Sequence, residues 1–478
     1  MIKPYKHNKN DPEPRNTRYV DKWDYKHVRM PCSPKNIKRD GTPRWPIICF
    51  ELTKLQSLCE IKSVKAKDIQ NAIERCTGRD WEIRCLEYLL DHIYSEDDKN
   101  HFLFTVLPNI IRLVLNVDNI CGQPPPLLKI GSNQTVTMSQ LQCASLLSCA
   151  FFCLFPRRQE QHGTEYERYQ NPNFNTMFFG SRHGPSSTKL EKLRSLLHYF
   201  TRITELMPVG VLSFSRYCLP ENGIPDWNKS KNTMCKLHLT KNKSIEDMHG
   251  FIQVDFANEY IGGGVMDNGC VQEEIRFIIY PEMLISLLLC EVMADRECIS
   301  FIGCERFSSY KGYSTTYEWN GTYNDTTSRD NWGRRLCHVV AIDAIRFSDP
   351  REQWKEKWCR RELLKAYAGF RVSDMEKHIL NGNIVGIATG NWGCGAFRGD
   401  KQLKALIQLM AASQAERPLI YCTRSDSNFL NKFGLLYDCL TRNNVEVNDL
   451  FKYLIEYSNG VRDKDLFDHI LLKVPVIQ

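Results

Sequence analysis

Apolar residues recur every three or four positions through much of the segment from residue 46 to residue 205. This spacing appears in residues 81–90 and returns in residues 102–117, 138–152 and 190–205. A period near 3.6 residues places apolar side chains on one face of a helix, so the spacing predicts helices. We expect a helical scaffold, because this half contains no dense set of titratable residues at catalytic spacing.

After Pro208 the apolar residues gather into short runs that are separated by polar turns. The runs that predict strands are residues 209–214, 250–256, 299–303, 339–343, 384–389 and 418–423. The segments that predict helices are residues 272–294, 357–369, 400–415, 450–457 and 466–472. Strands that alternate with helices are typical of a buried sheet with helices on both faces. The predicted fold class is therefore α/β.

Length and charge refine this division. A chain of 478 residues exceeds one ordinary core, so we expect a helical domain over 46–205 and a second domain over 206–478. Residues 1–45 form a polar arm broken by six prolines. Its first 44 residues hold 12 Lys and Arg against 5 Asp and Glu, a surplus equal to the whole net charge of +7. Such an arm either contacts an acidic polymer or nucleic acid, or is a solvated tail.

Cysteine spacing and hydropathy exclude several classes of protein. Twenty cysteines are present, but none forms the Cys-x-x-Cys pair typical of zinc sites, so we expect no metal site. The N-terminus has no apolar run typical of a secretory signal. No apolar stretch approaches the roughly 20 residues that span a bilayer. We therefore expect reduced cysteines, no membrane partner, and a location in the nucleus or the cytoplasm.

The residues that best fit a catalytic role lie between positions 255 and 274. A predicted buried strand carries one acid, and a triple glycine follows it, which permits positive φ and a close approach to a ligand. Three polar residues then open a predicted helix. The candidates of this stretch are Asp255, Asn258, Gly262, Gly263, Gly264, Gln272, Glu273 and Glu274. Acids in a first helical turn also suit the helix dipole, so helix stabilisation stays open as the role of the last two.

This stretch resembles the signature of the poly(ADP-ribose) glycohydrolase family, in which three glycines, seven residues and Gln-Glu-Glu follow one another. Further matching segments are Val254 to Asn258, Tyr310 to Tyr313 and Ala388 to Phe397, within a resemblance that extends from about residue 20 to about residue 455. It implies a macrodomain-like mixed sheet flanked by helices, with an N-terminal helical accessory domain. It also implies hydrolysis of ribose–ribose O-glycosidic bonds in poly(ADP-ribose), with release of ADP-ribose.

The resemblance gives the acids unequal roles. Glu274 would be the general acid/base of a reaction with an oxocarbenium-like transition state. Adjacent helical side chains point about 100° apart, so Glu273 and Glu274 cannot both act as acid and base on one bond from one side. The resemblance implies that Glu273 holds the ribose hydroxyls. Asp255 and Asn258 would fix the loop and the ribose, with Gln272 beside them. The substrate's phosphates would stabilise positive charge on the sugar, so neither a metal nor a cofactor is needed.

A second glycine-containing loop, residues 390–399, follows a predicted strand. Amides at such a strand end can face a phosphate, so we expect this loop and residues 262–269 to grip a diphosphate from two sides. Two ordinary tight turns are the alternative. The resemblance adds as substrate-binding candidates Ile245, Glu246, Tyr310, Tyr313, Asn391, Gly393, Cys394, Gly395, Ala396 and Phe397.

Several of these candidates have a specific role in the resemblance. Ile245 and Glu246 resemble the family's adenine-recognising pair, and Phe397 resembles the aromatic residue beside the distal ribose. Tyr313 resembles a tyrosine that lines the ADP-ribose pocket, although such an aromatic is more often part of a core. The chain departs from the family at Arg424, where an aromatic residue usually stacks on adenine. A guanidinium can also lie over a purine ring.

Three functions are compatible with these patterns. The first is a monomeric glycohydrolase that acts on poly(ADP-ribose) chains carried by modified proteins. The second is a non-catalytic macrodomain reader of ADP-ribose or poly(ADP-ribose), which would have no use for the second acid of Gln272-Glu273-Glu274. The third is a nucleic-acid-binding scaffold that uses the basic arm, and it predicts steep salt dependence.

Overall fold

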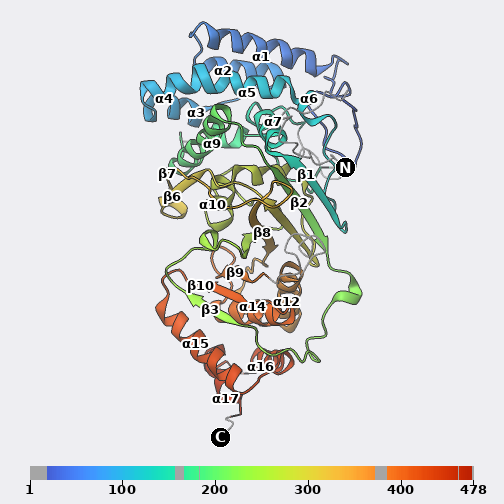
Figure 1. Cartoon of the computed structure of the whole chain (residues 1–478), viewed down its shortest axis with the longest axis vertical. Coiled ribbons are helices and arrows are strands. Elements are labelled where there is room, and N and C mark those ends of the chain that lie inside the picture. The colour runs from blue at the N-terminus through green and yellow to red at the C-terminus, as the bar shows by residue number, and fades with distance from the viewer. Residues whose placement is uncertain (1–18, 157–165, 182–183, 372–384, 461, 476–478) are drawn as a thin grey trace.

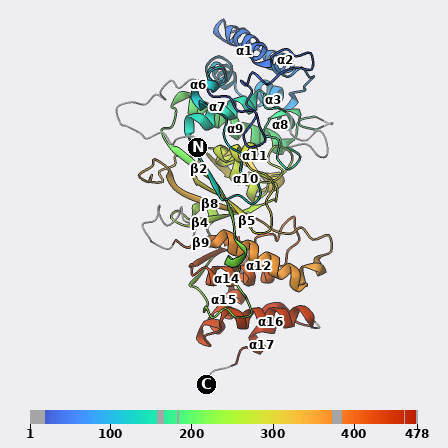
Figure 2. The same cartoon turned by 90° about the vertical axis from the view of Figure 1, so that its right-hand side faces the viewer.

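The computed structural model describes residues 19–156, 166–181, 184–371, 385–460 and 462–475. N-terminal helices, a central mixed sheet and C-terminal helices follow one another along the long axis of the molecule (Figures 1 and 2). The cartoon therefore shows the predicted α/β arrangement, in which helices cover both faces of a sheet.

The N-terminal layer consists of helices of very different length. They are α1 (Arg44–Glu60), α2 (Ala66–Thr77), α3 (Arg84–Tyr88), α4 (Glu96–His101), α5 (Leu107–Leu115), α6 (Val117–Cys121), α7 (Gln140–Phe151), α8 (Asn175–Phe179) and α9 (Ser187–Glu205). The helix expected over 102–117 is broken into a π-helical turn, α5 and α6. The helix expected from residue 138 begins at Gln140, because the Ser139 hydroxyl accepts from the Gln142 amide at 3.1 Å and caps it.

The sheet has eight strands in the order β1-β2-β5-β8-β4-β9-β10-β3. They are β1 (Gln134–Ser139), β2 (Val211–Cys218), β3 (Leu237–Thr240), β4 (Ile252–Ala257), β5 (Glu297–Gly303), β8 (Arg335–Asp343), β9 (Ile387–Gly390) and β10 (Leu419–Cys422). From β8 to β3 neighbouring strands are parallel, and from β1 to β8 they are antiparallel. A separate hairpin joins β6 (Ser308–Lys311) and β7 (Glu318–Thr322).

Alternation along the central strands divides the apolar core into two. In β8, Val339 and Ala341 belong to the cluster on the side of the N-terminal helices, whereas Val340 and Ile342 belong to the cluster on the opposite side. Side chains of successive strand residues point to opposite faces, so a sheet that is covered on both faces is mostly apolar along its strands. This double burial accounts for the continuous apolar runs in the sequence.

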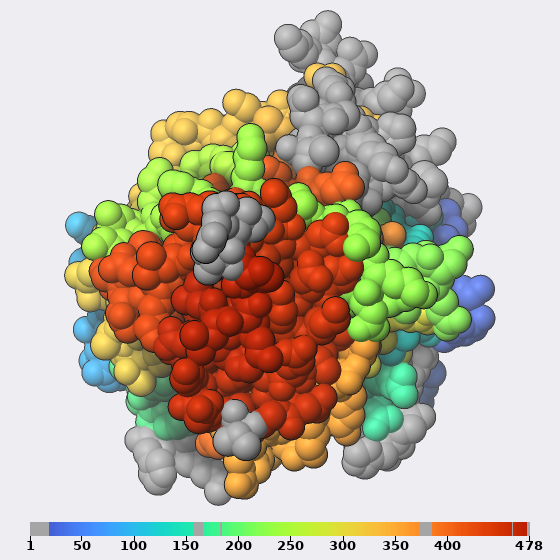
Figure 3. Space-filling model, turned by 90° about the horizontal axis from the view of Figure 1, so that it is seen from below, coloured from blue at the N-terminus to red at the C-terminus, as the bar shows by residue number. Residues whose placement is uncertain are grey.

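Different helices cover the two faces of the sheet. The cluster on the side of the N-terminal helices includes α10 (Gln272–Ile279), a 3-10 turn (Pro281–Leu284) and α11 (Ile285–Leu289). The other cluster includes α12 (Glu356–Phe370), α14 (Lys401–Gln414), α15 (Ser427–Arg442), α16 (Val447–Asn459) and α17 (Leu466–Lys473). Seen from below, the last of these helices cover most of that end of the molecule (Figure 3).

Several sequence predictions need correction. The helix expected over 272–294 ends at Ile279, because Pro281 lacks an amide proton, and only short helical pieces follow. Strand β1 was not predicted, although it pairs with β2 along six residues. The sheet thus contains strands from both sides of residue 205. The domain boundary at this residue stays a prediction. The first residue of the strand expected over 384–389 lies outside the described residues.

The predicted arm is described from residue 19 onward, and residues 1–18 lie outside the described part of the chain. Val28 and Met30 are fully buried among the N-terminal helices. His27 forms a β-bridge with Pro126. The arm is therefore attached to the helical layer over these residues. In the described residues, no helix is both long enough and apolar enough to cross a membrane.

Candidate active site

The acids of the central motif meet where strand β4 ends and helix α10 begins. Asp255 lies opposite Ala341 in the register of β4 and β8, and it is fully buried. The triple glycine follows β4, and Gln272 is the first residue of α10. The carboxyl ends of β4, β8, β9, β10 and β3 lie at one edge of the sheet because these strands are parallel. Ligands favour this edge in sheets of this kind.

Backbone amides hold both glutamates in place. Glu273 accepts from the amides of Asn258 at 2.9 Å and Gly262 at 2.6 Å. Glu274 accepts from the amide of Gly264 at 2.9 Å through one oxygen and from that of Val271 at 2.9 Å through the other. The two side chains are 3% and 6% exposed. Each acid is thus fixed by the loop that precedes its helix, with Glu274 also capping that helix.

The glycines of the loop lie against the carboxylates of Glu273 and Glu274, and two of them donate hydrogen bonds to these acids. A Cβ at Gly263 would lie 2.5 Å from Oε2 of Glu273 and 2.6 Å from Oε1 of Glu274, and its φ is +51°. The amides of Gly262 and Gly264 already donate to the two glutamates, and that of Gly263 donates to the Tyr260 carbonyl at 3.1 Å. These three amides are therefore not free to grip a diphosphate, and that role for residues 265–269 stays a prediction.

Burial raises the pKa values of two acids of the site. Burial raises the pKa of Asp255 to about 7, although Arg276 opposes it, and Glu274 raises it further. Burial also raises the pKa of Glu273 well above its usual value, and repulsion from Asp255 and Glu274 adds to this. Neither carboxylate oxygen of Asp255 has a hydrogen-bond partner among the described residues. Desolvation and crowding of like charge therefore favour protonated carboxyls here.

Gln272 and Asn258 connect the site to its surroundings. The side chain of Gln272 accepts from the Phe256 amide at 2.8 Å and donates to the Val254 carbonyl at 3.2 Å. The side chain of Asn258 accepts from the Tyr260 amide at 2.9 Å. Gln272 thus joins α10 to β4, and Asn258 shapes the turn that leads into the glycines.

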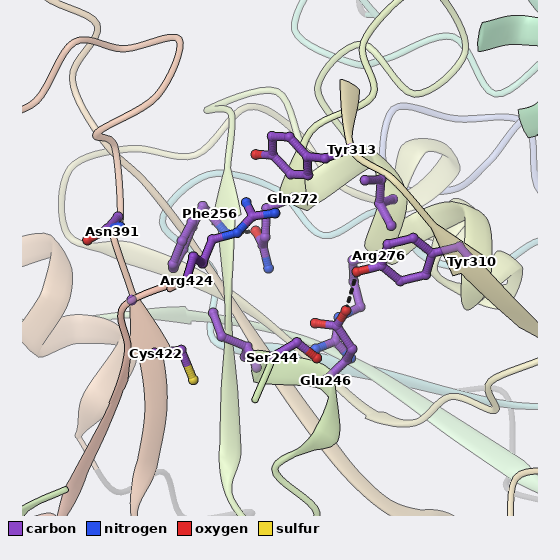
Figure 4. Close-up of a pocket in the computed structure, with 13 residues that line it drawn as sticks. Ser244, Glu246, Phe256, Gln272, Arg276, Tyr310, Tyr313, Asn391, Cys422 and Arg424 are labelled. Carbon is purple, nitrogen blue, oxygen red and sulfur yellow. Dashed lines mark hydrogen bonds between the residues drawn. The ribbon is translucent and has the colours of Figure 1, made fainter. Parts of the chain in front are cut away.

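A cavity opens beside this motif and brings together candidates that are far apart in the sequence (Figure 4). It encloses about 530 Å³ when the solvent at its mouth is included. The sequence candidates that line it are Ile245, Glu246, Gln272, Tyr310, Tyr313 and Asn391. The lining residues that were not candidates are Ser244, Phe256, Ile275, Arg276, Gly390, Cys422 and Arg424. Strands β4, β9 and β10, helix α10 and the turn Ile245–Asp247 all contribute to the cavity.

Tyrosines at two points of the cavity contact polar partners. The hydroxyl of Tyr310 points at the carboxylate of Glu246 and donates to it at 2.5 Å, as the dashed line in Figure 4 shows. The guanidinium carbon of Arg424 lies 3.9 Å from the ring centroid of Tyr313. Arg424 is exposed and has a φ of +52°. Arg424, which stands where the family usually has an aromatic residue, therefore stacks on Tyr313, which matches the family.

Arg276 is a site residue that sequence analysis missed. It is 2% exposed and lines the cavity, and none of its three side-chain nitrogens has a hydrogen-bond partner among the described residues. Its guanidinium carbon lies 4.9 Å from the ring centroid of Tyr280. Helical spacing could have identified it, because Gln272 and Arg276 are four residues apart on one face of α10.

Only one of the candidates in the second glycine-containing loop lines the cavity. Asn391 lines the cavity, whereas Gly393, Cys394, Gly395, Ala396 and Phe397 do not. The Phe397 carbonyl accepts from the Phe347 amide at 3.4 Å, and Cys394 lines a separate depression with Gly399 and Asp400. The backbone at Gly393 packs closely against Ala344, since a Cβ at this position would lie 2.7 Å from the side chain of Ala344. Their role in binding substrate stays a prediction.

The donor atoms needed for a metal centre are not gathered at one place in the described residues. No group of three or more His, Cys, Asp and Glu side chains there could hold an ion. All twenty cysteines are free thiols, and most are buried.

Comparisons with known proteins agree with this architecture. Residues 224–431 match the family model for poly(ADP-ribose) glycohydrolase with the macro domain fold, and residues 94–216 match the model for the helical domain of the same family. These matches confirm the predicted macrodomain-like sheet and the helical domain before it. A solved structure of Alphavirus P23pro-zbd aligns with 77% of this chain and 42% of its own at a TM-score of 0.26 and 12% identity, which is too remote to carry weight.

Curated relatives are similar over most of their length. Poly(ADP-ribose) glycohydrolase 1 of Arabidopsis thaliana is 31% identical over 447 residues, which covers 78% of this chain and 81% of that protein. Poly(ADP-ribose) glycohydrolase 2 of Caenorhabditis elegans is 33% identical over 405 residues, covering 80% of this chain and 77% of that protein. With both family models matched, the chain belongs to the poly(ADP-ribose) glycohydrolase family of enzymes.

Proposed function

We propose that this chain hydrolyses the ribose–ribose O-glycosidic bonds of poly(ADP-ribose) and releases ADP-ribose, with Glu274 as the general acid/base. The observation that carries the proposal is the arrangement of Glu273 and Glu274. Both are buried at the carboxyl ends of parallel strands, and different amides hold each of them. Neither lines the cavity itself, but both follow Gln272, which does. A protein that only bound ADP-ribose would not need two such acids.

In the proposed reaction the glycosidic bond breaks while Glu274 gives its proton to the leaving ribose oxygen. The sugar carbon passes through an oxocarbenium-like transition state. Water then adds to that carbon, and its proton returns to Glu274. The products are free ADP-ribose and a polymer shortened by one unit. The substrate's own diphosphate would stabilise the positive charge that develops on the sugar.

Glu273 and Asp255 act beside Glu274 in this proposal. The environment raises the pKa values of both carboxyls, so each can donate a hydrogen bond from a protonated oxygen. Glu273 would hold the hydroxyls of the reacting ribose. Asp255 is close enough to Glu273 to raise its pKa, and its buried carboxyl has no hydrogen-bond partner among the described residues. In the proposal it would help Glu273 to fix the loop and the ribose.

The cavity would hold the nucleoside part of the ligand. Glu246 presents a carboxylate that Tyr310 orients, and Ile245 lies beside it, so an exocyclic amine of a purine could donate to this carboxylate. Tyr313 and Arg424 offer flat groups against which a base can lie. The hydrogen-bonding potential of Arg276 is not used by the described residues, so its guanidinium can donate to the ligand.

The deciding experiment compares Glu274→Gln with Glu273→Gln on radiolabelled poly(ADP-ribose). We expect Glu274→Gln to lower kcat by about 10²- to 10⁴-fold, because it removes the proton that the leaving group needs. Its affinity for ADP-ribose, measured by calorimetry, should remain close to that of the wild type. Glu259→Gln is the matched control, since Glu259 is an exposed carboxylate that precedes the same loop.

Each result bears on a different part of the proposal. A wild-type protein that binds ADP-ribose and releases none from the polymer is a reader and not an enzyme. Full activity of Glu274→Gln with loss in Glu273→Gln would exchange the roles of the two acids. Loss of activity in the Glu259→Gln control would show that the assay reports folding instead of chemistry.

A further inference from the structure

The carbonyls of the loop that carries the triple glycine point toward the N-terminal helices. Lys192, in α9, is 0% exposed, and its ammonium nitrogen lies 2.7 Å from the Val265 carbonyl. It also lies 2.6 Å from the Asp267 carbonyl, 2.7 Å from that of Gly269 and 3.5 Å from that of Gly264. An ammonium has three donors, so the three short contacts use all of them.

Other residues of the N-terminal half hold the same loop. The side chain of Gln170 donates to the Gly263 carbonyl at 3.0 Å. The hydroxyl of Thr176 donates to the Met266 carbonyl at 2.9 Å. Lys189 lies one turn before Lys192 and pairs with the Asp267 carboxylate at 2.7 Å. Four side chains from outside the macrodomain thus hold one loop.

Because the peptide unit is planar, fixing its carbonyl also fixes the amide that donates to the acid. In a trans peptide the carbonyl and the amide of one unit point in opposite directions. The carbonyl of Gly263 accepts from Gln170, and the amide of Gly264, in the same unit, donates to Glu274. Lys192 fixes the rest of the loop up to Gly269, where a Cβ would lie 2.6 Å from Oε1 of Glu274. Rotation of these units would withdraw the amide from the acid.

A buried cation is a costly anchor for carbonyls that a neutral donor could also hold. Among the described residues, no carboxylate lies within ion-pair distance of Lys192. The ionisable groups that act on it are Cys270, Glu274, Lys189 and Asp267. The positive charge of Lys192 also attracts the carboxylate of Glu274, the proposed acid/base, from the other side of the loop.

We propose that Lys192 is a positioning residue of the hydrolysis, which fixes the loop so that the Gly264 amide holds Glu274 in its reactive position. The inference rests on the proposed function. It implies that the helical half contributes directly to turnover, whereas the cavity that binds the nucleoside is lined by residues outside the loop from Gly264 to Gly269. Loss of Lys192 therefore separates catalysis from binding.

The test measures kcat, KM and ADP-ribose affinity for Lys192→Met, whose side chain is similar in length and lacks donors. We expect kcat to fall by about 30-fold or more, because displacement of a reacting group by about 1 Å costs about 100-fold. KM and the Kd for ADP-ribose should change by less than about threefold, since the removed contacts act on the chemical step. Lys54→Met, at an exposed position of α1, is the matched control.

The pH dependence of kcat distinguishes a positioning role of Lys192 from a purely structural one. Burial lowers the pKa of Lys192 to about 8, with Cys270 and Glu274 opposing this. Below that pH the ammonium has three donors, and above it the neutral amine has two. Wild-type kcat should therefore fall as pH rises through about 8. The residual activity of Lys192→Met should lack this component.

Hydrogen exchange and a second variant keep the proposal testable if Lys192→Met folds poorly. In Lys192→Met the amides of residues 262–271 should exchange about tenfold faster, with exchange elsewhere unchanged. Gln170→Ala, which removes the contacts to the carbonyls of Gly263 and Tyr260, should lower kcat with KM unchanged. Wild-type kcat in both variants, or equal loss of kcat and affinity, would overturn the role of Lys192. An inactive wild type would instead overturn the proposed function.

Discussion

Substitution of Gly263 by alanine tests whether the loop is built for the acids. The φ of this residue is +51°, and a left-handed backbone costs a non-glycine residue about 1–2 kcal/mol. The new Cβ would stand 2.5 Å from Oε2 of Glu273, and ordinary contact begins at 3.4 Å. The carboxylate must therefore withdraw by about 0.9 Å, or the loop must move by the same amount. Glu274 is displaced by the same atom, since its Oε1 would lie at 2.6 Å.

A displacement of this size in a reacting group corresponds to a loss of about 100-fold in kcat. Gly131→Ala separates this effect from backbone strain, because the φ of Gly131 is +77° and no heavy atom lies within 4 Å of the position that its new Cβ would take. Gly131→Ala should lose about 1–2 kcal/mol of unfolding free energy, and Gly263→Ala at least as much because its Cβ also displaces the two carboxylates. Only Gly263→Ala should lose activity on poly(ADP-ribose). Equal kcat values in the two variants at equal thermal stability would refute the argument.

Two further predictions concern Asp255 and Arg424. The raised pKa of Asp255 means that the folded chain keeps a proton which the unfolded chain releases near pH 4, so the stability that this group contributes is lost as pH rises through about 7. The interval from 3.8 to about 7 sets an upper limit of about 4 kcal/mol, of which about a third is already lost at pH 5. Melting curves should therefore show Asp255→Asn stabilised relative to the wild type more at pH 8 than at pH 5, and an equal difference at the two pH values would contradict this. Arg424→Ala removes a stack worth about 0.5–1 kcal/mol and should raise the Kd for ADP-ribose by about two- to fivefold, whereas Arg424→Phe should bind within twofold of the wild type. Calorimetry that gives Arg424→Ala the wild-type affinity would show that the stack does not shape the cavity.

The most reliable predictions of the fold came from apolar patterns that reflect burial. Continuous apolar runs predicted the central strands because the sheet is covered on both faces, and β4, β5 and β8 lie where they were expected. Short or half-exposed strands such as β3 and β6 carry too little apolar signal to be recognised. Strand β1 was missed because its first four residues showed no recognised pattern and its last two were assigned to the helix that follows.

The site shows a similar limit. Residue types and their spacing identified the acids and the glycines, but the direction in which an amide points depends on tertiary contacts that no local pattern records. The amides of Gly262 and Gly264 were expected to face a phosphate and instead hold Glu273 and Glu274. Lys192 and Arg276 were missed because a single cation in an amphipathic helix is ordinarily a solvated residue. Only the fold shows that both are buried beside the acids.

The position of β1 has a consequence for fragments of this protein. β1 is the edge strand beside β2, so a fragment that begins after Ser139 would leave the backbone donors and acceptors on that side of β2 without partners. The first six residues of β2 are buried in the whole chain, from Val211 to Arg216. An exposed edge of this kind pairs readily with another copy of itself. A fragment that begins between Gln140 and Val211 would therefore self-associate through β2. A fragment that begins at residue 224, where the macro domain match starts, would lack β2 as well and would expose the edge of β5 instead.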